Sequence, residues 1–396
     1  MKLFSIQIAV TAGFCVTSSV LGGPVPSFQG LGDLTGGAFH SSARGVSPDG
    51  QVVVGQSMST LSGSAAEAFR WTRTGGIEAL GTHNGGTSGV ARAASQDGSV
   101  IVGTGSSSNS VLDAFRWTVG TGVVSLGDLP GGTFNSDASA VSADGSVIVG
   151  SSRSGSFESG EAFRWTESTG MVGLGALPGG TRSSAAAVSA DGQVIAGQVR
   201  LDNVGFSSEA FVWRESTGMV GLGDLPGGLF RSEALGISAD GSVVVGSANG
   251  ATGTEAVRWT EQGGISPLGI SGSAQAVSAD GSVIVGGTGS AAFVWDAERG
   301  LRNLQIFMAT EFGLSELAGW NLNIAHGISA DGTTIVGTGT NPAGQTEGWI
   351  AVIPEPATGL LLTLWMFLML TRRHGLARTN RPGIPIGLFS SGRPLP

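Results

Sequence analysis

A repeated segment constrains the fold of this chain more than any other feature of its sequence. Close variants of Ser-Ala-Asp-Gly-Ser-Val-Ile-Val-Gly, seen at residues 142–150, occur seven times, and each contains an Asp-Gly dipeptide. The dipeptides begin at Asp49, Asp97, Asp144, Asp191, Asp240, Asp280 and Asp331, with spacings of 48, 47, 47, 49, 40 and 51 residues. A period near 48 that carries only strand and turn signals is typical of one four-stranded propeller blade per repeat. We therefore expect an all-β fold, a seven-bladed β-propeller of four-stranded blades over residues 23–352.

One repeat shows the four expected strands most clearly. Residues 138–142 form strand A, an Asp-Gly turn leads to strand B at 146–150, and strands C and D follow at 161–165 and 171–174. Strand C ends in a tryptophan in most repeats: Trp71, Trp117, Trp165, Trp213, Trp259 and Trp295. These tryptophans could form either an aromatic sugar-binding platform or part of the hydrophobic core. Equal spacing in every repeat favours the core.

The two ends of the repeat array differ from its middle in complementary ways. The seventh repeat has strands A, B and C but no strand D, whereas residues 28–34 look like a strand D with no blade before it. We expect this N-terminal strand to complete the last blade and close the ring, which removes free sheet edges. Residues 304–317 have helical apolar spacing, so a helix is expected in place of an ordinary loop there.

Both termini have patterns that predict targeting signals. Residues 1–22 have the pattern of a secretory signal peptide, which contains the single cysteine, Cys15. Pro354, Glu355 and Pro356 precede fifteen uncharged residues, 357–371, and then Arg372 and Arg373. Fifteen helical residues cover about 22 Å against a hydrocarbon core of about 30 Å, so residues 353–374 are expected to be a marginal C-terminal transmembrane helix. The arginines mark its cytoplasmic side, which makes 375–396 a cytoplasmic or unexplained tail.

Two motifs carry a family resemblance. The repeat Leu-Gly-Asp-Leu-Pro-Gly-Gly-Thr, Ala-Val-Ser-Ala-Asp-Gly-Ser-Val-Ile-Val-Gly, Glu-Ala-Phe-Arg-Trp resembles the bacterial extracellular HAF-repeat family. Residues 352–356, the apolar segment and the two arginines resemble a PEP-CTERM sorting signal. The resemblances imply recognition by an exosortase, removal of the C-terminal helix, and delivery from the inner membrane to the envelope or extracellular matrix. They imply no particular activity.

Composition and spacing argue against several functions. The net charge is −9 and basic residues are scattered, so no nucleic-acid partner is expected. The histidines have no neighbours at metal-ligand spacing, and the Asp-Gly turns lack the further acidic residues of calcium loops. No metal, cofactor or catalytic residues are expected. Carboxylates mostly occupy equivalent repeat positions, at Glu67, Glu161, Glu209 and Glu255, whereas a catalytic pair would depart from the repeat.

One column of strand A varies between repeats. Its members are Arg44, Arg92, Ser139, Ala186, Leu235, Gln275 and His326. Arg44, Arg92 and His326 become neighbours if the ring closes between the seventh and first repeats, which makes them a candidate cluster at the channel mouth.

The loops between strands B and C also vary, at 56–66, 104–112, 151–160, 198–208 and 247–254. Variable loops on a rigid scaffold commonly carry binding specificity. We expect an exported, envelope-sorted structural or binding module that is not an enzyme, with an exopolysaccharide or envelope protein as partner. Two alternatives remain: a polysaccharide lyase or hydrolase acting through the cluster, and a lectin-like glycan binder.

Overall fold

The computed structural model describes residues 24–60, 65–82, 85–107, 111–201 and 207–354. The predicted signal peptide, the tail and four of the five sorting-motif residues, Glu355, Pro356, Arg372 and Arg373, lie outside the described residues; Pro354 is the last residue described.

The described chain is a succession of short strands. They are β1 (Ser27–Gly30), β2 (Gly36–Val46), β3 (Val52–Ser59), β4 (Ala66–Thr72), β5 (Gly76–Ala79), β6 (Gly89–Ala94), β7 (Ile101–Ser106), β8 (Leu112–Thr118), β9 (Gly122–Ser125), β10 (Ser136–Val141), β11 (Ile148–Ser152), β12 (Glu161–Thr166), β13 (Gly170–Gly173), β14 (Arg182–Val188), β15 (Val194–Arg200), β16 (Ser208–Arg214), β17 (Gly218–Gly221), β18 (Gly227–Ile237), β19 (Val243–Gly250), β20 (Gly253–Thr260), β21 (Gly264–Ser271), β22 (Ser273–Val277), β23 (Val283–Gly287), β24 (Ala292–Asp296), β25 (Gly300–Asn303), β26 (Asn321–Ile328), β27 (Thr334–Thr340) and β28 (Thr346–Val352). The strands predicted in one repeat correspond to β10–β13.

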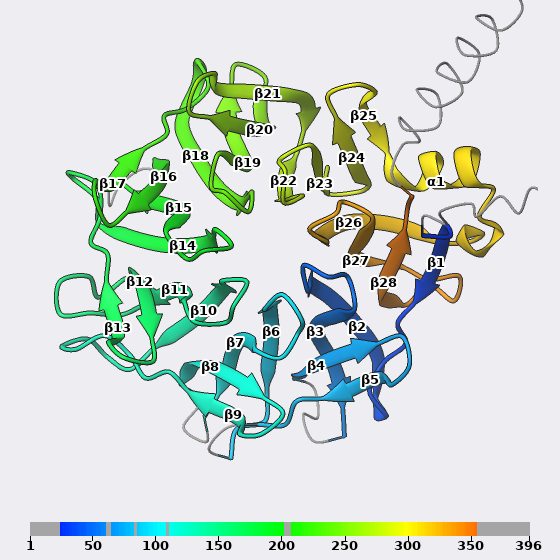
Figure 1. Cartoon of the computed structure of the whole chain (residues 1–396), viewed down its shortest axis with the longest axis horizontal. Helices are drawn as coiled ribbons and strands as arrows, with labels where there is room; N and C mark the ends of the chain where they lie inside the picture. Colours follow the sequence, from blue (N-terminus) through cyan, green and yellow to red (C-terminus); the bar gives the residue numbers. More distant parts are fainter. Residues whose placement is uncertain (1–23, 61–64, 83–84, 108–110, 202–206, 355–396) are drawn as a thin grey trace, which may run out of the picture. The chain divides into compact units, whose positions relative to one another are not determined.

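The strands form a β-propeller, whose sheets are arranged in a ring with the first strand of each repeat toward the centre (Figure 1). Five sheets have four strands, in the orders β2-β3-β4-β5, β6-β7-β8-β9, β10-β11-β12-β13, β22-β23-β24-β25 and β1-β28-β27-β26. The sixth sheet has eight strands, β14–β21. It consists of two four-stranded meanders joined where Ser208 of β16 pairs with Arg231 of β18 in parallel register. The prediction of a seven-bladed propeller of four-stranded blades is therefore wrong: five blades are four-stranded sheets, and the fourth and fifth repeats share one eight-stranded sheet.

The first strand of each repeat, strand A, contains a β-bulge at the same position. The register shifts between Ala43 and Gly45 in β2 and at the equivalent place in the other six repeats. The bulge explains why a glycine follows the apolar residues of strand B in the repeats. A Cβ on Gly150 would lie 1.9 Å from the carbonyl oxygen of Asp137, so only glycine fits beside the bulged backbone.

The Asp-Gly turn is organised by side-chain hydrogen bonds. The buried Ser142 hydroxyl donates to Asp144 Oδ1 at 2.6 Å and accepts the Val147 N–H at 3.0 Å. Asp144 also accepts the Ser146 N–H at 3.0 Å, while Gly145 supplies the positive φ of 75°. The serine, the amide and the second serine hydroxyl hold the pKa of the Asp144 carboxyl below its ordinary value. The turn therefore needs the aspartate for its hydrogen bonds and the glycine for its backbone conformation.

Backbone hydrogen bonds between these turns form a closed circle around the axis. The donor–acceptor pairs are Gln96 N to Ala143 O, Ala143 N to Ala190 O, Ala190 N to Ala239 O, Ala239 N to Ala279 O, Ala279 N to Ala330 O, Ala330 N to Pro48 O, and Asp49 N to Gln96 O. The first repeat has Pro48 where most others have alanine. Because proline has no N–H, the next amide, that of Asp49, donates in its place.

Apolar contacts join neighbouring repeats. Val54 and Ala68 of the first repeat share one buried cluster with Ile101 and Phe115 of the second. Trp71, Trp117 and Trp259 are buried, and the Arg70 guanidinium lies 5.6 Å from the centroid of the Trp117 ring in the next repeat. These tryptophans contribute to the core between repeats.

The N-terminal strand closes the ring. β1 pairs antiparallel with β28, from Ser27 opposite Val352 to Gly30 opposite Trp349, and so supplies the fourth strand of the last sheet. Figure 1 shows β1 beside β28. Leu31 and Leu34 then enter a buried cluster with residues of the first and last repeats. This pairing confirms the prediction of closure by residues near the N-terminus.

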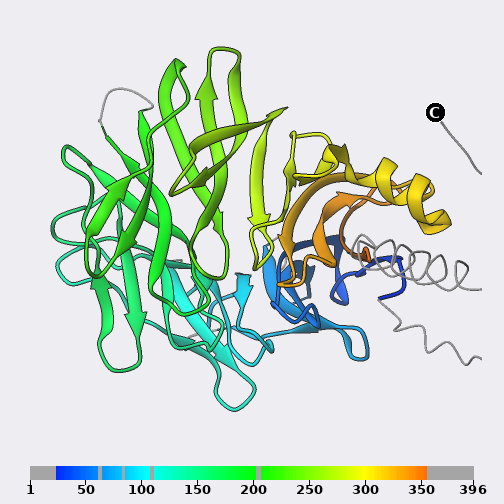
Figure 2. The same ribbon diagram turned by 45° about the horizontal axis from the view of Figure 1, so that its top comes forward.

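The predicted helical segment is present. It forms the helix α1 (Leu304–Phe312) and the 3₁₀ turn η1 (Ser315–Leu317), at the outer edge of the ring (Figure 2). The Asn303 side chain caps α1 by accepting the Ile306 N–H at 2.9 Å, and Gly313 ends it with φ 63°.

No transmembrane helix belongs to the described fold, in contrast to the fold class expected from the sequence. Within the described residues no helix is long and apolar enough to cross a membrane; α1 has nine residues. The predicted apolar segment 357–371 lies outside them.

Candidate functional site

The bulged residues surround a cavity of about 410 Å³ on the axis of the ring. Its lining includes the variable column of strand A in full: Arg44, Arg92, Ser139, Ala186, Leu235, Gln275 and His326. A bulged residue has no direct partner across the strand pair, so its side chain is free to be directed away from the ladder. Here the bulge directs one side chain per repeat to the axis, which gives seven positions that can differ without disturbing the sheets.

Three of these positions carry basic side chains from adjoining repeats. Arg44 lies on β2, Arg92 on β6 and His326 on β26, and the described residues that line the cavity include no carboxylate. The structure thus brings together the three residues singled out in the sequence. Their clustering contrasts with the whole chain, which has 20 Lys and Arg against 29 Asp and Glu.

The three basic side chains differ in whether another group of the protein pairs with their charge or accepts their hydrogen bonds. The Arg92 guanidinium pairs with the carboxylate of Asp137 at 2.8 Å. The Nε atom of Arg44 is buried and has no hydrogen-bond partner among the described residues. Burial, together with the nearby Arg92 charge, lowers the pKa of Arg44. An unpaired buried donor is costly, so an acceptor from outside the protein would be favoured at this point.

The third group, His326, is neutral at physiological pH. Burial, with a smaller contribution from the Arg44 charge, lowers the pKa of His326 to about 4. A neutral imidazole has one donor and one acceptor nitrogen. At pH 7 the cavity therefore offers two guanidinium groups and a neutral imidazole, a set that suits a carboxylate, sulfate or phosphate group.

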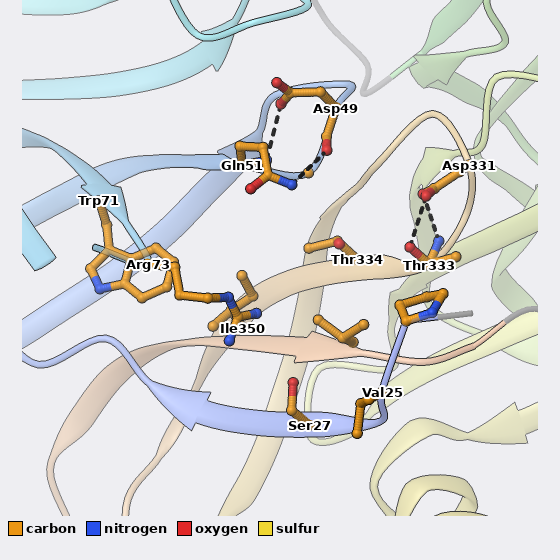
Figure 3. Close-up of a pocket in the computed structure, with 13 residues that line it drawn as sticks. Val25, Ser27, Asp49, Gln51, Trp71, Arg73, Asp331, Thr333, Thr334 and Ile350 are labelled. Atoms are coloured by element: carbon orange, nitrogen blue, oxygen red, sulfur yellow. Dashed lines mark hydrogen bonds between the residues drawn. The ribbon is translucent and has the colours of Figure 1, made fainter. Parts of the chain in front are cut away.

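A second cavity, of about 470 Å³, lies at the closure of the ring (Figure 3). Val25, Ser27, Asp49, Arg73 and Asp331 are among its lining residues. Its carboxylates are occupied by their own turns, because each accepts hydrogen bonds from the serine two residues before it and from the amide two residues after it. This cavity lies where strands from the two ends of the described chain, β1 and β28, pair to close the last sheet in place of a hairpin. Because its carboxylates are already hydrogen-bonded within their turns, the axial cavity is the stronger candidate for a binding site.

Sequence reasoning missed the partner of Arg92. Asp137 lies on β10, in the next repeat, two residues before the variable column. The spacing alone places Asp137 on the same face of the strand as Ser139 of the variable column, since residues two apart on a strand share a face. The bulge that directs this column to the axis was not visible in the sequence.

Comparisons with known proteins give no family. No family model and no curated protein sequence matches the chain. Among solved structures, TolB from Acinetobacter baumannii is 18% identical with a TM-score of 0.42, over 56% of this chain and 52% of that protein, so the chain spans about half its length. A putative TolB from Agrobacterium tumefaciens is 14% identical with a TM-score of 0.40, over 79% of this chain and 90% of that one. The Dos1 propeller is 11% identical with a TM-score of 0.42, over 83% and 95% of the two chains.

Proposed function

We propose that this protein is an exported, non-enzymatic binding module that holds an anionic group of its ligand in the axial cavity. One observation carries the proposal. Arg44, Arg92 and His326 are bulged residues of three adjoining repeats, and all three line one cavity whose described lining residues include no carboxylate. The β-propeller supplies a rigid frame for them, which reduces the entropy lost on binding.

Binding is tested by following the imidazole signal of His326 while the full chain is titrated with sulfate, inorganic phosphate or glucuronate. An anion beside the imidazole favours its protonated form, so the pKa of His326 should rise from about 4 on binding. Arg44→Gln should weaken binding about tenfold or more, since hydrogen bonds to charged groups contribute about 1.5–3 kcal/mol. The control is Arg164→Gln, a half-buried arginine of β12 away from the cavity. An unchanged His326 signal with all three anions would refute an axial anion site.

A polysaccharide lyase acting at the same cluster is the second candidate. The neutral imidazole beside Arg44 favours it, because a base and a group that neutralises a carboxylate are what β-elimination from a uronate needs. Incubation with polygalacturonate separates the two functions. A binding module leaves the polymer intact, whereas a lyase produces unsaturated ends that His326→Gln abolishes.

Export and envelope sorting also belong to the proposal, and rest on the signal-peptide pattern and the resemblance to a PEP-CTERM signal recognised by an exosortase. A chain with one tag between Ser152 and Glu161 and another after Pro396 tests them. We expect the first tag outside the cell on a shortened chain without the second tag. Recovery of both tags on one chain in the cytoplasm would refute export.

A further inference from the structure

A row of arginines crosses the eight-stranded sheet. Arg182 of β14 lies directly opposite Arg200 of β15, Arg200 opposite Ser208 of β16, and Ser208 pairs with Arg231 of β18. Neighbouring strands are about 4.8 Å apart, so the row is about 14 Å long from first strand to last. It ends at the pairing that joins the fourth and fifth repeats into one sheet.

Two of the three arginines in the row lack a partner among the described residues. Like charges directly opposite each other destabilise a strand pair, and Arg182 and Arg200 are such a pair. The side chains of Arg182 and Arg231 make no hydrogen bond or ion pair with other described residues, and both residues are exposed. Asp224 is near, but its carboxylate accepts the backbone amides of Arg231, Leu225 and Asn249.

The row borders a cavity of about 260 Å³ whose other lining residues are polar. A second row, Ser184 opposite Gln198, lies two residues along on the same face, and Ser183, Ser207 and Ser208 complete the lining. The described lining holds no carboxylate and no aromatic ring. Guanidinium groups recognise carboxylate and sulfate in bidentate fashion, while hydroxyl and amide side chains match a molecule rich in hydroxyl groups.

The arginines depart from the repeat. Three residues before the buried alanine of strand A, the repeats carry His40, Ser88, Asn135, Arg182, Arg231, Ser271 and Leu322 in order. Arginine thus occurs at this position only in the two repeats that share a sheet. From the row, the lack of a partner for Arg182 and Arg231 among the described residues, and the hydroxyl-rich surroundings, we infer that Arg182, Arg200 and Arg231 form a second anion site, separate from the axial cavity, that binds an acidic saccharide through its carboxylate or sulfate groups.

The experiment measures binding to the full chain by calorimetry, with trigalacturonate and a sulfated oligosaccharide as parallel probes. The double variant Arg182→Gln, Arg231→Gln should weaken binding of at least one probe about tenfold or more. Arg214→Gln, at the other end of β16, is the matched control and should leave binding unchanged. Equal binding by the parent and the double variant would overturn the inference.

Two further binding measurements distinguish the arginine row from the axial cavity and from a site for any polyanion. In the Arg44→Gln protein, which lacks the proposed axial site, the further changes Arg182→Gln and Arg231→Gln should still weaken saccharide binding about tenfold, so the loss of the axial site and the loss of the arginine row are distinguishable. Short-chain polyphosphate has charge without sugar hydroxyls, and binding as tight as that of either saccharide would overturn the saccharide assignment.

The stability of the free protein provides a test that needs no ligand. Arg182→Gln should raise the urea midpoint, because it removes a like-charge pair. A lower midpoint would mean that the row is stabilised by contacts within the chain, and would overturn the inference as well.

Discussion

The ring of Phe28 lies 6.3 Å from the ring of Trp349, centroid to centroid, with the two planes tilted by 36°. Phe28 also meets Trp320 edge to face at 5.1 Å. Phe28 belongs to β1, at the start of the described chain, and Trp349 to β28, near its end. Trp349 stands where most repeats have phenylalanine, and its larger ring packs against a strand that comes from the other end of the sequence. Closure of the propeller therefore depends on an aromatic contact as well as on strand pairing.

Phe28→Ala should lower the free energy of unfolding by about 3–5 kcal/mol, as expected when a buried phenylalanine is truncated. The side chain is 6% exposed and belongs to the cluster that contains Trp349 and Leu304. Urea unfolding followed by tryptophan fluorescence measures the loss. Phe134→Ala removes a phenylalanine that is 43% exposed, and should change stability far less. Equal losses in the two variants would show that the closure contact has no special importance.

The bulge predicts that two glycines of one strand differ in their tolerance of alanine. A Cβ at Gly103 of β7 would lie 2.0 Å from the carbonyl oxygen of Val90, whereas one at Gly105 would lie 3.6 Å from its nearest atom, the carbonyl oxygen of Ser88. We expect Gly103→Ala to cost about 3 kcal/mol through displacement of β6 from β7. Gly105→Ala should stay within about 0.5 kcal/mol of the parent. Denaturation by urea compares them, and similar stabilities would contradict the assignment of the glycine to the bulge.

The turn network predicts a coupled change in stability and in the pKa of one carboxyl group. Ser142→Ala removes a donor to Asp144 and leaves the Val147 amide without its acceptor, so it should cost about 1–3 kcal/mol. The pKa of Asp144 should rise toward its ordinary value, because the Ser142 hydroxyl is the largest cause of its lowering. Carboxyl chemical shifts measured against pH test this. Ser168→Ala, in an exposed turn of the same repeat, should leave the pKa of Asp144 unchanged.

The repeat predicted much of this architecture because local and global signals agree. The Asp-Gly period predicted the strands and turns, and the missing strand D of the last repeat predicted the closure by β1. The shared sheet of the fourth and fifth repeats was not predictable in this way, since it depends on a single parallel pairing between Ser208 and Arg231. Likewise, the column of Arg44, Arg92 and His326 was visible as variation in the sequence. Its projection into the cavity depends on a bulge, which has no signal in a hydrophobic pattern of period two.

The buried imidazole at the axis predicts a pH dependence of stability between pH 6.5 and about 4. His326 has a pKa of about 4 in the folded protein and an ordinary value of 6.5 when unfolded, so the unfolded chain binds more protons in this interval. Stability should therefore fall as the pH falls through it, by up to about 3 kcal/mol from this residue. The other charged groups that line the cavity are Arg44 and Arg92, and Arg92 pairs with Asp137, which lies outside the lining. The turn carboxyls with lowered pKa values, such as Asp144 and Asp331, lose their contributions to stability only at lower pH, below their ordinary value of 3.8.

Urea unfolding at several pH values from 7 to 4 should thus show a decline in the free energy of unfolding of the parent. His326→Gln should largely remove this decline, and His40→Gln should retain it. A parallel decline in all three proteins would place the titrating group elsewhere.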